Sequence, residues 1–239
     1  MGTGVAPLWQ GLIDNRRAMR RITRFDPTGL RNERGGQVRE WSFEPSGFGL
    51  PQAPDEATQF LLVASREALN DAGLAGEPES QAHAVRPERF GAVLATNFGG
   101  AMSWERFVAG WLGGDTPARD FEEFCFDTAL DYLCRCFGLR GPCSLLSIAC
   151  ASGSASVGAA LDMIRYGRAD VMLCGGHDTL SPSLLGGLSV LRTMSPDDIL
   201  PFSANRSGTL FGEGAGVLVL ESLKHAQARG ARMYCEVMG

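Results

Sequence analysis

The sequence predicts an α/β fold in which helices cover both faces of a mainly parallel β-sheet. Three short apolar runs lack the polar alternation of a half-exposed strand, and they occupy residues 90–96, 143–149 and 169–174. Stretches of helical period lie between these runs, and a glycine follows each stretch. Two further strands are predicted at residues 215–220 and 233–238. We expect one domain, because no linker or low-complexity segment interrupts the 239 residues.

The helices are predicted from their apolar faces and from the residues at their ends. Residues 55–72 form an amphipathic stretch, with Asp55 placed to cap its first turn and Gly73 to end it. Two more stretches have the same period, at residues 120–137 and 152–166. Loops are expected where periodicity is weak and glycine, proline or polar residues are frequent, at residues 1–50 and 77–89.

Composition and charge are those of an ordinary globular protein. Hydrophobic residues make up 44% of the chain, and the formal net charge of -5 gives no support for a nucleic-acid partner. No apolar run approaches the ~20 residues of a membrane span. The seven cysteines are irregularly spaced, which predicts reduced thiols in a cytoplasmic protein. The one close pair, Cys134 and Cys136, is interpreted as two thiols on a helix, and we expect no metal site.

Two glycine-rich stretches require an explanation, at residues 211–216 and 175–176. The first precedes a predicted strand, whereas a phosphate-binding loop lies between a strand and a helix. The second lacks the third glycine and the helix of a dinucleotide-binding motif. Close packing of backbones is therefore the better interpretation, and we expect no cofactor.

Residues 147–154, Ser-Ile-Ala-Cys-Ala-Ser-Gly-Ser, carry the clearest chemical signal. A buried strand enters a tight turn of small residues and a helix follows, which places Cys150 at an elbow at the carboxyl edge of the sheet. The positive end of the helix favours the thiolate form, and the Cys150 backbone N–H can supply half of an oxyanion hole. The alternative is a buried, inert cysteine.

The same residues resemble the nucleophile block of the β-ketoacyl synthases, a family of the thiolase superfamily. Other blocks that resemble this family follow one another in the family's order, at residues 21–26, 64–73, 164–176, 188–195, 206–208 and 212–221. The resemblance implies a thiolase-like fold and a β-ketoacyl synthase N-terminal domain over residues 1–239. It implies decarboxylative Claisen condensation in fatty-acid or polyketide biosynthesis, with Cys150 carrying the acyl group. Implied partners are thioesters of acyl carrier protein or coenzyme A and a second copy of the chain.

Two further site residues are implied by the resemblance. Phe98 matches the position that closes the far end of the acyl pocket, and Leu188 matches another residue of the pocket lining. A large ring at Phe98 would favour short or medium acyl chains, although simple core packing explains it equally well. Ser203 and Ser207 stand where the family usually has aspartates around its arginine, which predicts weaker ion pairing there.

The family's two catalytic histidines and its second oxyanion donor lie in its second half. We expect that this half and the first strand are missing, and that the chain condenses nothing unless a second polypeptide supplies them. His83, His177 and His225 do not match, and His177 is expected to be structural or at the surface. Two other functions are considered: a non-catalytic partner subunit of the chain-length-factor type, which usually lacks the cysteine, and another acyltransferase of the thiolase superfamily.

Overall fold

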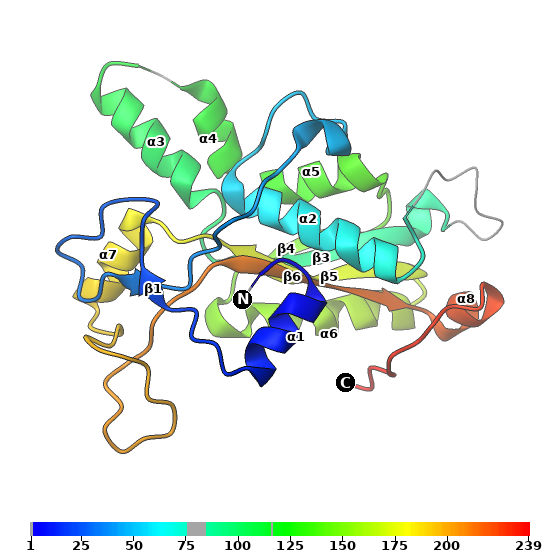
Figure 1. Ribbon diagram of the computed structural model, residues 1–239. Helices are drawn as coiled ribbons and strands as arrows, with labels where there is room; N and C mark the ends of the chain where they lie inside the picture. The colour runs from blue at the N-terminus through cyan, green and yellow to red at the C-terminus, as the bar shows by residue number, and fades with distance from the viewer. Residues whose placement is uncertain (1, 76–84, 116) are drawn as a thin grey trace. The chain divides into compact units, whose positions relative to one another are not determined.

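The computed structural model describes residues 2–75, 85–115 and 117–239 (Figure 1). Their contacts divide the chain into two compact units, each assembled from three separate segments. The first unit contains Met1–Ser42, Gly100–Phe124 and Thr179–Gly214, and the second contains Phe43–Gly99, Cys125–Asp178 and Ala215–Gly239. The expectation that residues 1–239 form one domain stays a prediction.

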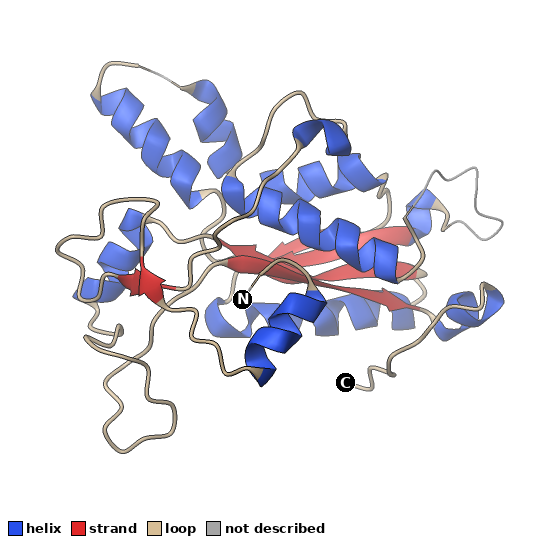
Figure 2. Cartoon of the chain, in the orientation of Figure 1, coloured by secondary structure: helices blue, strands red, loops and turns tan. Residues whose placement is uncertain are grey.

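The second unit is built on a four-stranded sheet (Figure 2). In sheet order its strands are β4 (Cys143–Leu146), β3 (Phe90–Ala95), β5 (Val171–Asp178) and β6 (Gly214–Glu221). β3 pairs in parallel with β4 and with β5. β6 runs in the opposite direction. The Ser222 N–H at its end donates to the carbonyl of Asp170, just before β5, at 2.8 Å, so the end of β6 lies beside the start of β5. The prediction of a mainly parallel sheet is confirmed.

Helices cover this sheet on both faces, with α2 and α5 on one face and α6 on the other (Figure 1). The helical elements of the unit are η1 (Pro45–Phe48), α2 (Glu56–Asp71), η3 (Pro87–Arg89), α5 (Thr128–Phe137), η4 (Ala149–Ala151), α6 (Ser152–Arg165) and α8 (Leu223–Ala228). The ends of α2 are as predicted. The Asp55 side chain accepts a hydrogen bond from the Ala57 N–H at 3.0 Å, and Gly73 follows the helix with a φ of 67°.

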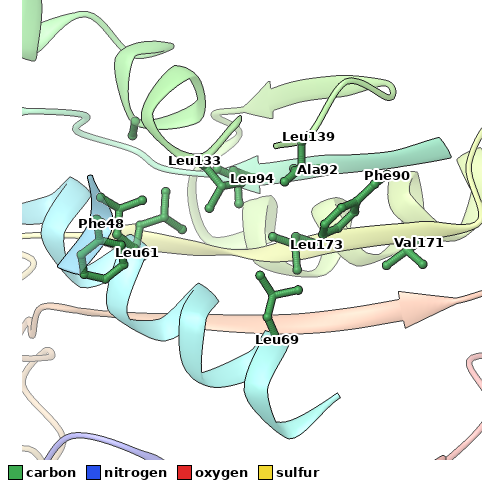
Figure 3. Packing of buried hydrophobic residues seen from close by; sticks show 12 residues of the cluster. Phe48, Leu61, Leu69, Phe90, Ala92, Leu94, Leu133, Leu139, Val171 and Leu173 are labelled. Carbon is green, nitrogen blue, oxygen red and sulfur yellow. The ribbon is translucent and has the colours of Figure 1, made fainter. Parts of the chain in front are cut away.

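An apolar cluster on each face holds the helices against the sheet. Successive residues of β3 point to opposite faces, so that Ala92 and Leu94 join the cluster under α2 and α5, whereas Val93 joins the cluster above α6. Figure 3 shows the first cluster, where Leu61 of α2 and Leu133 of α5 are fully buried. Burying one such leucine stabilises the fold by about 1.5–3 kcal/mol.

The first unit has a smaller apolar core and two short antiparallel strands. Its elements are α1 (Val5–Ile13), β1 (Arg20–Arg21), β2 (Arg34–Gly35), α3 (Ala101–Leu112), α4 (Ala118–Phe124) and α7 (Pro182–Val190). The core residues are Ile22, Leu180, Leu185, Met194 and Leu210. Aromatic contacts join α3 to α4, with ring centroids 4.7 Å apart for Trp104 and Phe124 and 5.3 Å apart for Phe107 and Phe121.

A buried carboxylate, that of Glu213, joins separate segments of the first unit. Its side chain is fully buried. It accepts two hydrogen bonds from the Arg24 guanidinium, at 2.5 and 2.6 Å, and one each from the backbone N–H groups of Val38 and Leu180, at 2.8 and 3.0 Å. Four donors replace the water that this carboxylate loses on burial.

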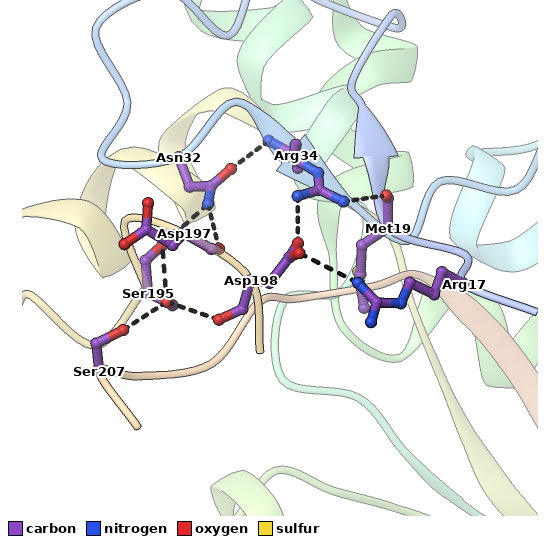
Figure 4. A network of polar contacts seen from close by, with 8 residues as sticks. All are labelled: Arg17, Met19, Asn32, Arg34, Ser195, Asp197, Asp198 and Ser207. Carbon is purple, nitrogen blue, oxygen red and sulfur yellow. Dashed lines mark hydrogen bonds and ion pairs between the residues drawn. The ribbon is translucent and has the colours of Figure 1, made fainter. Parts of the chain in front are cut away.

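A second polar network joins residues 17–34 to the loop around residue 198 (Figure 4). The Asp198 carboxylate pairs with Arg34, and with Arg17 at 3.2 Å. The Asn32 side chain donates to the Ser195 carbonyl at 3.0 Å. Within the same loop the hydroxyls of Ser195 and Ser207 are 2.7 Å apart.

The surroundings of Arg206 bear on the weak ion pairing predicted there. The Arg206 guanidinium donates to the backbone carbonyl of Ser203 at 3.0 Å, which is a neutral acceptor. The other serine at these positions, Ser207, contacts a hydroxyl rather than the arginine.

Several predicted elements differ from those observed. The predicted helix 120–137 is two helices, α4 and α5, because residues 125–127 form a turn where the chain passes from the first unit to the second. The predicted strand 143–149 ends at Leu146. It is exposed or half-buried rather than buried, because β4 lies at the edge of the sheet with β3 as its neighbour.

One other prediction is wrong. Residues 233–238 form no strand, and their apolar side chains Met233, Tyr234 and Met238 are exposed. Residues 1–50 are rich in loops, as predicted, and also contain the helix α1 and the short paired strands β1 and β2. Of the loop predicted at 77–89, residues 77–84 lie outside the described residues, and Pro87–Arg89 form η3.

Candidate functional site

Cys150 lies at the predicted elbow between strand and helix. β4 ends at Leu146, the short 3-10 turn Ala149–Ala151 contains Cys150, and α6 begins at Ser152. The first N–H groups of a helix have no acceptor within it, so the positive end of α6 lies beside this residue. The Cys150 side chain is exposed, so it is not a buried cysteine, and its reactivity stays a prediction.

The backbone turns sharply just before this cysteine. Ala149 has a φ of 58°, in the left-handed region that residues with a Cβ rarely adopt. The buried Ser152 closes the turn, since its hydroxyl donates to the Ala149 carbonyl and accepts from the Ile148 N–H, both at 2.8 Å. This role of Ser152 was not predicted from the sequence. The signal for it was a serine at the start of a helix, because such a side chain can form hydrogen bonds with the neighbouring backbone.

Polar contacts join the loops that follow β3, β4 and β5. The Asp178 carboxylate at the end of β5 accepts hydrogen bonds from the Thr96 hydroxyl at 2.8 Å and from the N–H groups of Asn97 and Phe98 at 3.0 and 3.1 Å. The Asn97 side-chain oxygen lies 3.4 Å from the Ser152 hydroxyl. Burial raises the pKa of Asp178, while the donated hydrogen bonds oppose that shift. The carboxyl ends of three parallel strands are thus held together around the elbow.

The two predicted pocket residues lie in different units. Phe98 is half-buried in the loop after β3, at the same edge of the sheet as the Cys150 turn. Leu188 is half-buried on α7 in the first unit, where it packs against that unit's apolar core. Their roles in an acyl pocket stay predictions.

The histidines serve the fold in different ways. His177, near the end of β5, is buried, and neither ring nitrogen has a hydrogen-bond partner among the described residues. It is therefore not a surface residue. His225 pairs with Glu221, which also accepts two hydrogen bonds from Arg229 at 2.7 and 2.6 Å. His83 lies outside the described residues.

Acidification is expected to destabilise the fold through His177. Burial lowers the pKa of this histidine from 6.5 to about 4, so between these values the unfolded chain binds a proton that the folded chain does not. Above pH 6.5 the free energy of unfolding is not lowered by this histidine. It falls as the pH falls from 6.5 to about 4, by about 3 kcal/mol in all. Urea midpoints at pH 7 and pH 4.5 measure the effect against the His177→Leu variant, in which it should vanish; an equal acid loss in both proteins would refute it.

The glycine-rich stretches are sites of close backbone packing, as predicted. A Cβ placed on Gly175 would lie 2.0 Å from the Gly216 carbonyl oxygen, and one placed on Gly36 would lie 3.1 Å from the Cα of Gly212. Among the described residues no cluster of histidine, cysteine or carboxylate side chains could hold a metal ion. Within the same residues, no helix combines the length and the apolar character needed to cross a membrane.

An exposed cysteine at a strand-to-helix elbow of a mainly parallel sheet is the arrangement of a thiolase-like α/β protein, and known proteins support this class. A ketosynthase/chain length factor for ishigamide has a TM-score of 0.84 and 32% identity over 97% of this chain and 57% of its own. A type II polyketide synthase ketosynthase, in complex with its acyl carrier protein, has a TM-score of 0.81 and 28% identity over 98% of this chain and 58% of its own.

Sequence comparison identifies the family. The family model described as beta-ketoacyl synthase, N-terminal domain, matches residues 1–226, and the chain belongs to the β-ketoacyl synthase family. The tetracenomycin polyketide synthase ketoacyl synthase alpha subunit of Streptomyces glaucescens is 35% identical over 258 residues. That alignment includes all of this chain and 58% of the relative, so the chain spans somewhat more than half of the relative's length.

Proposed function

We propose that Cys150 is the nucleophile of a decarboxylative Claisen condensation. Its thiolate attacks the carbonyl of an acyl thioester, and the carrier leaves as a thiolate while the acyl group stays on the Cys150 sulfur. A malonyl thioester then loses carbon dioxide, and the electrons of the broken bond form a carbanion at its C2. This carbanion attacks the acyl-cysteine, the new carbon–carbon bond forms, and Cys150 leaves as a thiolate.

One observation carries this proposal: in a chain of this family, Cys150 is exposed at the positive end of α6. Exposure admits the thioester, and the helix end favours negative charge that develops beside it. The N–H of Cys150 belongs to the opening turn, where N–H groups lack partners in the helix, so it is suited to the oxyanion of the attacked carbonyl. The Ser152 and Asp178 hydrogen bonds keep these loops in place, so that little reorganisation is needed for reaction.

We also propose that the 239-residue polypeptide alone does not complete the condensation. Decarboxylation needs the family's two histidines. Of the two described histidines, His177 is buried without a hydrogen-bond partner, and His225 is paired with Glu221. The family's two histidines would come from further sequence or from a second polypeptide. We propose that the chain works in an assembly with a second subunit. The acyl carrier protein and chain length factor in the titles of the similar structures support such partners.

The substrates are thioesters of acyl carrier protein or coenzyme A, and the pathway makes a polyketide or a fatty acid. The polyketide synthase subunit among the relatives supports the first. We place the reaction in the cytoplasm, because the irregular spacing of the seven cysteines favours reduced thiols.

A condensation assay tests this function. The 239-residue chain, with and without the family's second half supplied as a separate polypeptide, is mixed with an acyl thioester and malonyl-acyl carrier protein. We expect carbon dioxide and a 3-oxoacyl product from the complemented chain, and only acylation of Cys150 from the chain alone. Condensation by the chain alone would overturn the need for added histidines, and a complemented mixture that never acylates Cys150 would overturn the enzymatic role.

A second candidate function is a non-catalytic partner subunit of the chain-length-factor type. The likeness to a ketosynthase/chain length factor favours it, because both subunit types share the fold. Reaction with a mechanism-based ketosynthase inhibitor separates the two functions. A catalytic subunit is alkylated at Cys150, whereas a subunit that only shapes a partner's pocket leaves this thiol unmodified.

Phe98 is proposed to limit the length of the acyl chain. The Phe98→Ala change removes a half-buried ring at the sheet edge that carries the elbow, and should raise the kcat/KM for longer acyl chains relative to short ones by roughly tenfold. Chain-length profiles of the complemented enzyme measure this ratio. Phe137→Ala, which removes another half-buried ring packed on the core, is the control and should leave the profile unchanged. A Phe98→Ala profile like that of the control would count against the role.

A further inference from the structure

A pair of thiols lies outside the candidate site. The Sγ atoms of Cys134, on α5, and Cys143, at the start of β4, are 3.4 Å apart. Cys134 is half-buried and Cys143 is exposed. Cys134 and Cys136 lie on one helix, α5, as predicted, and the sulfur that contacts Cys134 is that of Cys143. Side chains of a strand alternate between the two faces of the sheet, and Cys143 points to the face that α5 covers.

The two thiols differ chemically. Either sulfur could donate in this contact, which raises the pKa of Cys134 and lowers the pKa of Cys143 to about 7, while burial opposes the second shift. Cys143 pairs with Ala92 of β3, and a backbone hydrogen bond of Ala92 also lowers the pKa of Cys143. An exposed thiol with a lowered pKa thus lies in contact with a half-buried thiol. This is the arrangement of an attacking and a resolving cysteine.

We propose that Cys134 and Cys143 form a redox-responsive dithiol that closes to a disulfide when a hydroperoxide oxidises it. The Cys143 thiolate attacks the peroxide, one sulfur–oxygen bond forms, the oxygen–oxygen bond breaks, and the leaving oxygen departs as water after taking a proton. The Cys134 sulfur then attacks the sulfenic acid, the sulfur–sulfur bond forms, and a second water leaves. Two thiols and one hydrogen peroxide thus give one disulfide and two waters, and a thiol reductant reverses the change.

The disulfide would tie α5 to the edge strand that leads to the elbow. Cys143 and Cys150 are seven residues apart, and only residues 144–149 lie between the dithiol and the proposed nucleophile. The dithiol itself rests on the Sγ–Sγ contact and does not depend on the proposed function. Its failure and the failure of that function are therefore separate results.

Peptide mapping of the oxidised chain tests the proposal. Trypsin places Cys134 in residues 120–135 with Cys125, Cys136 in residues 136–140, and Cys143 in residues 141–165 with Cys150. In a Cys125→Ser/Cys150→Ser variant, brief treatment with hydrogen peroxide should join residues 120–135 to residues 141–165, with the loss of two hydrogens. Dithiothreitol should separate them. Peptides that stay apart while Cys143 is oxidised, or a bond from Cys134 to Cys136, would overturn the proposal.

Matched serine variants give a second, independent readout. In the Cys134→Ser variant the Cys143 sulfenic acid has no resolving partner, so a dimedone probe should trap it several-fold more than in the parent. The Cys136→Ser variant, changed on the same helix two residues away, should behave as the parent does. Equal trapping in the parent and in Cys134→Ser would contradict the pairing, and circular dichroism establishes that each variant is folded.

Discussion

Replacing Cys150 with alanine is expected to lower the rate of acyl transfer to the chain by on the order of a thousandfold or more. The change removes one exposed sulfur at the elbow and leaves the Ser152 hydrogen bonds that shape the turn. Intact-protein mass spectrometry of the chain mixed with an acyl thioester follows the acyl adduct with time. The loss should be chemical rather than structural, because the Cys150 side chain has no part in the apolar clusters of the unit.

Two comparisons make this result specific. Cys136→Ser, which changes a half-buried thiol on α5, should leave the rate of acylation unchanged. Cys150→Ser keeps a hydroxyl in the same place, but an alcohol is a far weaker nucleophile than a thiolate, so it should be nearly as slow as the alanine variant. Acylation that continues at the parent rate in Cys150→Ala would place the nucleophile elsewhere.

The largest loss of stability is expected from a change in the first unit, Glu213→Gln. The amide keeps the shape of the side chain but removes the buried negative charge that neutralises the Arg24 guanidinium. It also replaces one carboxylate oxygen, which accepts a hydrogen bond from the N–H of Val38 or Leu180, by an NH2 group, which can only donate. Breaking a buried ion pair on one side costs about 3–5 kcal/mol, which is a large part of the stability of a unit of this size.

Urea denaturation measures this loss, and hydrogen exchange locates it. Protection should fall first in the segments that Glu213 joins, around Arg24, Val38 and Leu180. Glu33→Gln is the matched control, because its carboxylate pairs with Arg21 at 3.0 Å on the surface and should matter by about 1 kcal/mol or less. Equal destabilisation by the two changes would show that the four hydrogen bonds of Glu213 do not hold the first unit together.

Local signals explain why the elbow could be predicted from the sequence. An apolar run, a turn of small residues and a helical period follow one another within about twenty residues, and each has a direct structural cause. The caps of α2 and the glycines packed against a neighbouring backbone are equally local. The order of the blocks that resemble the family gave the fold class, which the comparisons confirm.

Contacts between distant residues explain what the sequence did not show. The edge position of β4 depends on which strands pair, and nothing within residues 143–149 records that pairing. The helical period continues through residues 125–127, so the break between α4 and α5 left no periodic signal. Glu213 lies 189 residues from Arg24, and Cys134 lies across a turn from Cys143, so neither contact could be predicted from spacing.

The central claim is that one exposed sulfur among several reacts with thioesters because of where the fold holds it. Cys125, Cys143, Cys150 and Cys235 are all exposed, so exposure alone does not select among them. Brief treatment of the reduced chain with an acyl thioester, followed by site-resolved mass spectrometry of every cysteine peptide, measures the selection directly. We predict that the acyl group appears first on residues 141–165, with fragment ions that assign it to Cys150. An acyl group that appears first on Cys143 or another exposed cysteine, or equally on all four, would contradict the account.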